Sequence, residues 1–140
     1  NWVSEVPADH RAFARALIDL GTADIVHGHS SHHPLPIEVY RGKLILYGCG
    51  DLINDYEGIG LHDGQRSDVG CLYLATLQAG SGQLVALNIV PMQLRRFRLA
   101  HADASARRWV SHQLDRADRW PGTRLDDQAD GSWQLRWSDT

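Results

Sequence analysis

Residues 24–34 read DIVHGHSSHHP, a short β-branched run followed by a glycine and a cluster of histidines. Half of the chain's eight histidines fall here, at positions 27, 29, 32 and 33. Imidazole is the commonest metal ligand among protein side chains, and open α/β sheets bind their ligands at strand ends. The stretch therefore predicts a buried strand over 24–27 that leads into a candidate metal-binding loop.

The spacing of the histidines suits metal binding without requiring it. Two histidines three residues apart on a loop can reach one metal ion, or each can reach one ion of a pair, and Zn, Mn and Fe accept imidazole together with carboxylate oxygen. Gly28 allows a sharp turn at the strand end, and Pro34 and Pro36 stiffen the exit of the loop. A polar loop that binds no metal fits the same residues, so both interpretations stay open at this point.

The segment before this loop predicts a helix. Asp9 is a good N-cap, Gly21 is a good stop, and apolar residues recur at helical spacing at positions 13, 16, 17 and 20. A helix followed directly by a strand is half of a βαβ unit, which implies a parallel strand before Asn1. We therefore expect an unpaired edge, or a partner chain, beside the strand at Asp24.

The segment after the loop predicts mainly strands. A hairpin is expected over 37–40 and 44–47, an irregular loop over 51–68, a strand buried on both faces over 70–77, its return over 83–90 and a one-sided edge strand over 94–99. Asp103 is expected to cap a helix whose apolar face runs from Ala106 to Trp120, ending at Pro121-Gly122. Trp133, Leu135 and Trp137 alternate as in a one-sided final strand, and Cys49 and Cys71 are expected to be buried free thiols.

Composition narrows the classes of function. The chain has 140 residues, 43% hydrophobic and 22% charged, which is the size of one domain. A formal net charge of −3 argues against nucleic-acid binding. No apolar run is long enough to span a bilayer, so we do not expect this segment to enter a membrane. The sequence starts at Asn1 without a methionine, and we expect it to be part of a longer protein.

Two runs of sequence carry a specific resemblance, GTADIVHGHSSH at 21–32 and PIEVYRGKLILYGCGD at 36–51. They are similar to the patterns "ADxVIGHHPH" and "IExYxGKxIxYSLGNF" of the CapA-type poly-γ-glutamate capsule biosynthesis proteins, in the C-terminal half of those proteins. This family is part of the calcineurin-like metallophosphatase superfamily. The resemblance covers about the first 60 residues. Asp51 stands where the family usually has Asn, and Cys49 where it often has Leu.

The resemblance implies an α/β fold, the C-terminal portion of a calcineurin-like α/β/β/α sandwich of two packed sheets flanked by helices. Residues 1–140 would be one domain fragment, with the helix, loop strand and hairpin in 1–60 and the remaining strands and covering helix in 61–140. By the same resemblance His29 and His32 are ligands of a divalent metal pair (Mn, Fe or Zn). His27 and His33 lie outside the pattern. We expect them to be exposed, although they and Asp51 also suit contacts that support the ligands or touch substrate.

The function implied is that of a metal-dependent, phosphatase-like hydrolase linked to poly-γ-glutamate or capsule polymer biosynthesis. The superfamily motifs Asp-x-His, Gly-Asp-x-x-Asp and Asn-His are absent from this chain, so no catalytic set is complete here and the metal site is incomplete. We expect the N-terminal half of the same protein to be its partner, with a polymer or phosphoester as substrate and a second copy bound through the exposed sheet edge. A non-catalytic accessory or binding protein for polymer synthesis or export is the alternative. A bacterial parent in the cytoplasm or the cell envelope fits either function.

Overall fold

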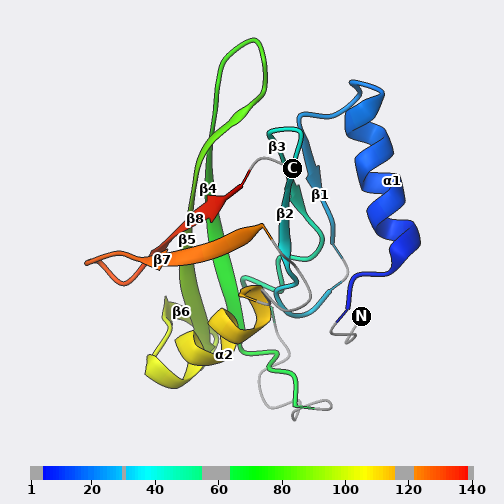
Figure 1. Ribbon diagram of the computed structural model, residues 1–140. Coiled ribbons are helices and arrows are strands. Elements are labelled where there is room, and N and C mark those ends of the chain that lie inside the picture. Colours follow the sequence, from blue (N-terminus) through cyan, green and yellow to red (C-terminus); the bar gives the residue numbers. More distant parts are fainter. Residues whose placement is uncertain (1–4, 30, 55–63, 116–121, 139–140) are drawn as a thin grey trace.

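The computed structural model describes residues 5–29, 31–54, 64–115 and 122–138. Two helices and eight strands occur in these ranges (Figure 1). In chain order they are α1 (Ala8–Asp19), β1 (Ile25–His27), β2 (Ile37–Tyr40), β3 (Lys43–Leu46), β4 (Val69–Leu77), β5 (Leu84–Arg95), β6 (Arg98–His101), α2 (Ala104–Leu114), β7 (Thr123–Asp127) and β8 (Trp133–Trp137). The predicted α/β class is confirmed. None of the helices described is long and apolar enough to cross a membrane.

The strands form two sheets. The first has the order β1-β3-β2, with β1 parallel and β2 antiparallel to β3. The second has the order β4-β5-β8-β7, and β6 pairs with β5. The main core joins side chains of β2 and β3 to side chains of β4, β5, β8 and α2, so the two sheets pack against each other. Helix α1 lies along the opposite face of the first sheet, in a smaller core (Figure 1).

Helix α1 occurs where it is predicted, but its cap and its covered face differ from the prediction. Pro7, not Asp9, is the N-cap residue, and its fixed φ suits a helix start. Ala14 and Ile18 are buried against Ile45 of β3, whereas Phe13 is 66% and Leu20 75% exposed. In the described ranges the sheet beneath α1 has three strands, so it covers a narrow stripe of the helix.

Strand β1 is an edge strand. The prediction that it is buried is wrong. Its three residues alternate exposed, intermediate and exposed, and Ile25 is 37% exposed. Among the residues that the structure describes, β1 pairs with β3 alone. The expected unpaired edge beside the strand at Asp24 is therefore present.

The hairpin of β2 and β3 is confirmed. Its two-residue turn, Arg41-Gly42, has φ values of 50° and 72°. Positive φ at both central residues is the geometry that matches the twist of paired strands. The hairpin supplies Ile37, Val39 and Leu44 to the main core.

The second sheet departs from the sequence prediction in two places. Beyond Cys71, β4 extends out of the core, and Leu72 and Leu74 are 40% and 50% exposed, so the strand is not buried on both faces. The edge strand predicted over 94–99 is wrong. β5 continues to Arg95 and turns through Arg96-Phe97 at φ 50° and 57° into β6. A positive-φ pair without glycine gives no strong sequence signal for a hairpin.

The C-terminal part mostly follows its local signals. The Asp103 side chain accepts a hydrogen bond of 2.8 Å from the backbone N–H of Ala106, which confirms the predicted N-cap of α2. Val110 and Leu114 are buried as expected. Ala117, Trp120 and Pro121 lie outside the described residues. β8 shows the predicted one-sided burial, but its hairpin partner β7 was not predicted. Cys49 and Cys71 are free thiols, Cys71 buried and Cys49 partly so.

Candidate functional site

The histidine loop packs against the turn that follows β3. The backbone N–H of Leu35 donates to the carbonyl of Gly48 at 2.9 Å, and Pro34 forms an isolated β-bridge with Cys49. A Cβ on Gly48 would lie 2.7 Å from Cβ of Ser31, closer than real contacts allow. The two runs that carry the family resemblance therefore meet in space, and glycine at position 48 permits the contact.

A second glycine fixes the start of the loop. The Gly28 N–H donates to the carbonyl of Leu46 at 2.7 Å and extends the pairing of β1 with β3 by one residue. A Cβ at Gly28 would lie 2.2 Å from the backbone oxygen of Tyr47. Any side chain here would push the two strands apart, so Gly28 sets where the histidines leave the sheet.

The turn brings a carboxylate to one of the predicted ligands. Nδ1 of His32 lies 2.8 Å from Oδ2 of Asp51, and the two side chains are 23% and 25% exposed. Nδ2 of Asn54 donates to the same carboxylate oxygen at 3.1 Å and to the carbonyl of Ser67 at 3.3 Å. Asp51 therefore receives hydrogen-bond partners from two sides, which orients it toward the imidazole.

The other three histidines have distinct environments. His27 and His29 are exposed, as expected for His27. The expectation that His33 is exposed is wrong, because it is fully buried. Its Nδ1 lies 3.1 Å from the carbonyl oxygen of Pro34, and its ring stands edge-on to Trp109 of α2, with centroids 6.4 Å apart. His33 therefore links the loop to the core through packing, which the loop sequence alone does not reveal.

The donor set fits a metal centre only in part. An imidazole whose second nitrogen pairs with a carboxylate is the usual support of a metal-ligating histidine. A metal site needs at least three protein donors, and no group of three His, Cys, Asp or Glu side chains suited to a metal occurs among the described residues. His29 and His32 with Asp51 thus form at most one part of such a site.

One buried ionic network was not predicted. Glu38 of β2 is 7% exposed and accepts a hydrogen bond of 2.9 Å from Nε of Arg15 in α1 and one of 2.6 Å from the hydroxyl of Tyr47. Burial, followed by the hydrogen bond to Glu38, raises the pKa of Tyr47 above its usual range. The sequence signal was a lone glutamate in the apolar strand IEVY. The network holds α1 to the sheet directly beside the residues that contact Gly28.

Sequence comparisons extend the resemblance. The family "Bacterial capsule synthesis protein PGA_cap" matches residues 1–56. The chain is 47% identical over 125 residues to a "Probable polyglutamine synthesis accessory protein" of Mycobacterium tuberculosis, in two strains. It is 42% identical over 59 residues to the PGA biosynthesis protein CapA of Bacillus subtilis, an alignment that covers 39% of the chain and 15% of that protein. The predicted relationship to the CapA-type capsule biosynthesis proteins is confirmed.

The coverage of these CapA-type relatives is uneven. The mycobacterial alignment takes in 89% of this chain, so the second half, where no family motif was recognised, is also shared with that protein. The same alignment covers 33% of the mycobacterial protein. The chain thus spans about a third of the length of those relatives, in agreement with the expectation of a longer parent.

Proposed function

We propose that this chain is part of a CapA-like, metal-dependent, phosphatase-like hydrolase that acts in the synthesis of a glutamate polymer. The contact between His32 and Asp51 is the observation that carries the proposal. It joins a histidine of the family loop to a carboxylate of the family turn, in the arrangement that usually supports a metal ligand. The names of the relatives support the link to polymer synthesis.

In this proposal His29 and His32 would hold the metal, a pair of Mn, Fe or Zn ions. Such a pair, when bound, supplies a hydroxide near neutral pH and neutralises charge on a phosphoryl group. Asp51 would accept a hydrogen bond from Nδ1–H of His32 and so favour the tautomer in which the other ring nitrogen donates its lone pair to a metal. The remaining ligands and the acid–base groups would come from the rest of the parent, and the substrate would be a phosphoester or the polymer itself.

We further propose that the two sheets are part of a calcineurin-like α/β/β/α sandwich whose first sheet continues beyond β1. The edge of β1 and the exposed Ile25 suit pairing with another strand. That strand would come from the rest of the parent or from a second copy of the chain. The molar mass of the parent from light scattering distinguishes these two sources. A strand from the same molecule leaves a monomer, whereas a strand from a second copy gives a dimer.

The test uses the full-length parent with His29→Ala and His32→Ala, and His27→Ala as the matched control. We expect both test variants to lose bound metal, measured by elemental analysis, and phosphoesterase turnover together. The control should keep both, because His27 is an exposed histidine in the same segment. If both test variants kept bound metal and turnover, the proposal would be wrong.

A non-catalytic role is the second candidate, and two observations favour it. The mycobacterial relatives are named accessory proteins, and the described residues gather no group of three metal-binding side chains. A parent stripped of metal by a chelator should then still support polymer synthesis in a reconstituted system. Loss of polymer synthesis on chelation, with recovery on adding Mn or Zn, would favour the hydrolase.

A further inference from the structure

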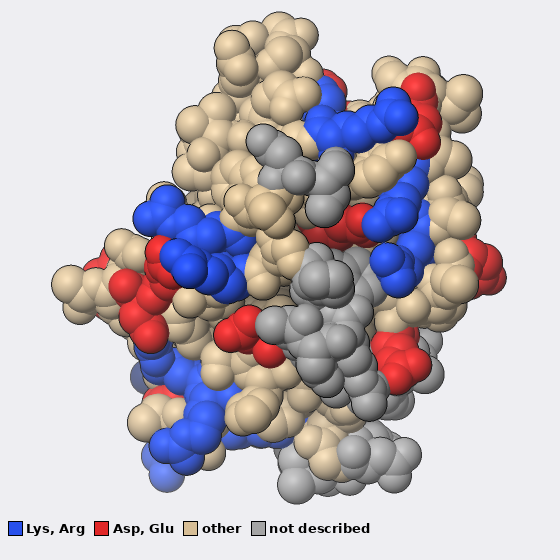
Figure 2. All heavy atoms as spheres, in the orientation of Figure 1, with Lys and Arg blue, Asp and Glu red and all other residues tan. Residues whose placement is uncertain are grey.

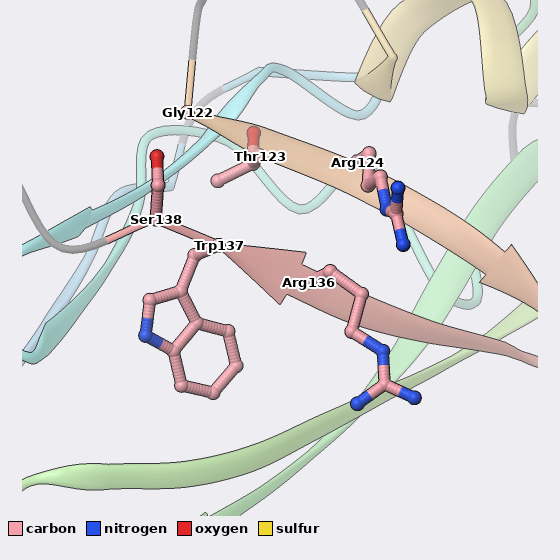
Figure 3. A pocket seen from close by; sticks show the side chains of 6 residues that line it. All are labelled: Gly122, Thr123, Arg124, Arg136, Trp137 and Ser138. Atoms are coloured by element: carbon pink, nitrogen blue, oxygen red, sulfur yellow. The ribbon is translucent and has the colours of Figure 1, made fainter.

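A depression of about 400 Å³ lies at the open end of the β7–β8 hairpin, outside the histidine loop. Its volume is within the range of small-molecule sites. It is lined by residues of both strands and their ends (Figure 3): Gly122, Thr123, Arg124, Arg136, Trp137 and Ser138.

Two arginines give this depression its charge. Arg124 and Arg136 are directly opposite each other in the register of β7 and β8. Like charges in such a pair repel, so the arrangement needs a counter-charge. Asp126 provides one, with its carboxylate 2.8 Å from Nε of Arg136 and 3.4 Å from Nε of Arg124. The hydrogen bond from Arg136 lowers the pKa of Asp126, so this carboxylate is charged at neutral pH.

The three groups together leave one net positive charge, exposed to solvent. The side chains of Arg124 and Arg136 are 71% and 52% exposed. Within the part of the chain that the structure describes, Asp126 contacts both guanidinium groups at Nε, and their Nη groups make no hydrogen bond. Figure 2 shows basic side chains gathered beside acidic ones over β7 and β8. The outer edges of both guanidinium groups are therefore available to a further anion.

The rest of the lining is mixed in character. The hydroxyl of Thr123 donates to the carbonyl of Ile37 at 3.3 Å and keeps its capacity to accept, and Ser138 is an exposed hydroxyl. The indole of Trp137 is partly buried and offers an apolar surface beside Arg136 (Figure 3). A ligand that combines anionic groups with short aliphatic segments matches this lining better than a compact inorganic anion does.

We propose that this depression binds a chain of linked glutamyl units through its carboxylates. Guanidinium groups bind carboxylates in bidentate geometry, and the methylene groups of a glutamyl chain can pack on Trp137. The choice of a glutamyl chain rests on the proposed function, whereas the preference for an anion rests on Arg124 and Arg136 alone.

The test measures binding of fluorescent γ-linked pentaglutamate to the full-length parent by anisotropy, with inorganic phosphate as competitor. Arg124→Gln and Arg136→Gln should each weaken binding about tenfold, the loss expected for one charge-assisted contact. Arg108→Gln, an exposed arginine on α2, is the matched control and should leave binding unchanged. Added salt should weaken binding of the wild type, because the contacts are exposed.

Circular dichroism and melting temperature verify that each variant folds. If Arg136→Gln fails to fold, Arg124→Gln still tests the proposal, because Arg124 is the more exposed of the two arginines. Absence of pentaglutamate binding, or equal binding by all variants, overturns the proposal. Free glutarate serves as a second competitor, and displacement by phosphate at the same concentration as by glutarate overturns the assignment to a carboxylate ligand. The metal proposal fails separately, because its readouts are bound metal and phosphoesterase turnover in His29→Ala and His32→Ala, whereas this proposal is read from the loss of pentaglutamate binding in Arg124→Gln and Arg136→Gln.

Discussion

Nδ1 of His32 and Oδ2 of Asp51 lie 2.8 Å apart, although the two residues are nineteen positions apart in sequence. The contact exists because Pro34 bridges to Cys49 and brings the loop beside the turn. Asn54 donates to the same oxygen of Asp51 and so orients the carboxylate. A carboxylate beside Nδ1 favours the tautomer with Nδ1 protonated and orients the ring before any ligand arrives.

Replacing Asp51 tests this positioning role. Asp51→Ala in the parent should weaken metal binding about 10–100-fold, the usual effect of removing a carboxylate behind a ligating histidine. Asp51→Asn should be much milder, because an amide oxygen can still accept a hydrogen bond from Nδ1–H and the related family pattern has Asn at this position. Calorimetric titration of the metal-free parent with Mn or Zn measures both. Equal losses in the two variants would show that the charge, and not the hydrogen bond, is what matters.

The buried Glu38 network should contribute to stability. Arg15→Ala leaves the Glu38 carboxylate, 9% exposed in its side chain, without its cation. We expect a loss of about 1–3 kcal/mol in the free energy of unfolding, less than for a fully buried pair because Arg15 is 40% exposed. Urea denaturation of this chain measures it.

Arg41→Ala is the matched control for that change. Both arginines lie over the Tyr40 ring, at 4.9 and 5.7 Å, and both pair with a carboxylate. The Arg41–Asp19 pair is 65% and 40% exposed, so its loss should cost about 0.5 kcal/mol or less. An equal loss for Arg15→Ala would mean that the burial of Glu38 adds nothing.

Features set by neighbouring residues were predictable from the sequence. The Arg41-Gly42 turn between two short, largely apolar segments specifies the hairpin of β2 and β3, and Asp103 specifies the start of α2. The position of the histidine loop in the chain was also predicted correctly, because Gly28 and Pro34 mark its two ends.

Features decided by distant packing were not predictable. The covered face of α1 depends on the width of the sheet below it, and the burial of His33 depends on Trp109, far away in sequence. Leu72 and Leu74 read as core residues, yet β4 extends past the layer that would cover them. The partner of His32 could not be found from spacing, because Asp51 reaches it only through the packing of the loop on the turn.

The close approach at Gly28 gives a prediction about sterics. Gly28→Ala would place a Cβ 2.2 Å from the backbone oxygen of Tyr47, and a backbone atom cannot move aside as a side chain can. We expect a loss of about 3 kcal/mol in the free energy of unfolding, at the upper end of overpacking costs. The parent should also bind metal more weakly, because the loop would shift.

Gly21→Ala separates this effect from backbone strain. Gly21 has a φ of 66° but no atom within 4 Å of its would-be Cβ, so only the left-handed conformation is penalised, at about 1 kcal/mol. Metal binding should be unchanged in this variant. If Gly21→Ala and Gly28→Ala cost the same on urea denaturation, contact with Tyr47 is not what requires glycine at position 28.

The two free thiols, Cys71 buried and Cys49 partly buried, predict how stability changes at alkaline pH. Burial raises the pKa of Cys49 to about 11 and that of Cys71 to about 12, from an ordinary value of 9.0. The unfolded chain therefore releases these protons at lower pH than the folded chain does. The resulting contribution to stability is complete below pH 9 and is lost as the pH rises from about 9 to about 12. Tyr73, whose pKa burial also raises, adds a change of the same sign.

Urea denaturation at a series of pH values should thus show a free energy of unfolding that falls above pH 9, and a Cys71→Ala variant should show a shallower fall. Alkylation by iodoacetamide at neutral pH should be slow for both thiols, because each is protonated, and slower for Cys71, which is buried, than for Cys49, which is partly exposed. Rapid labelling of Cys71 in the folded chain would contradict its place in the core. A stability that stays level into the alkaline range would contradict the raised pKa values.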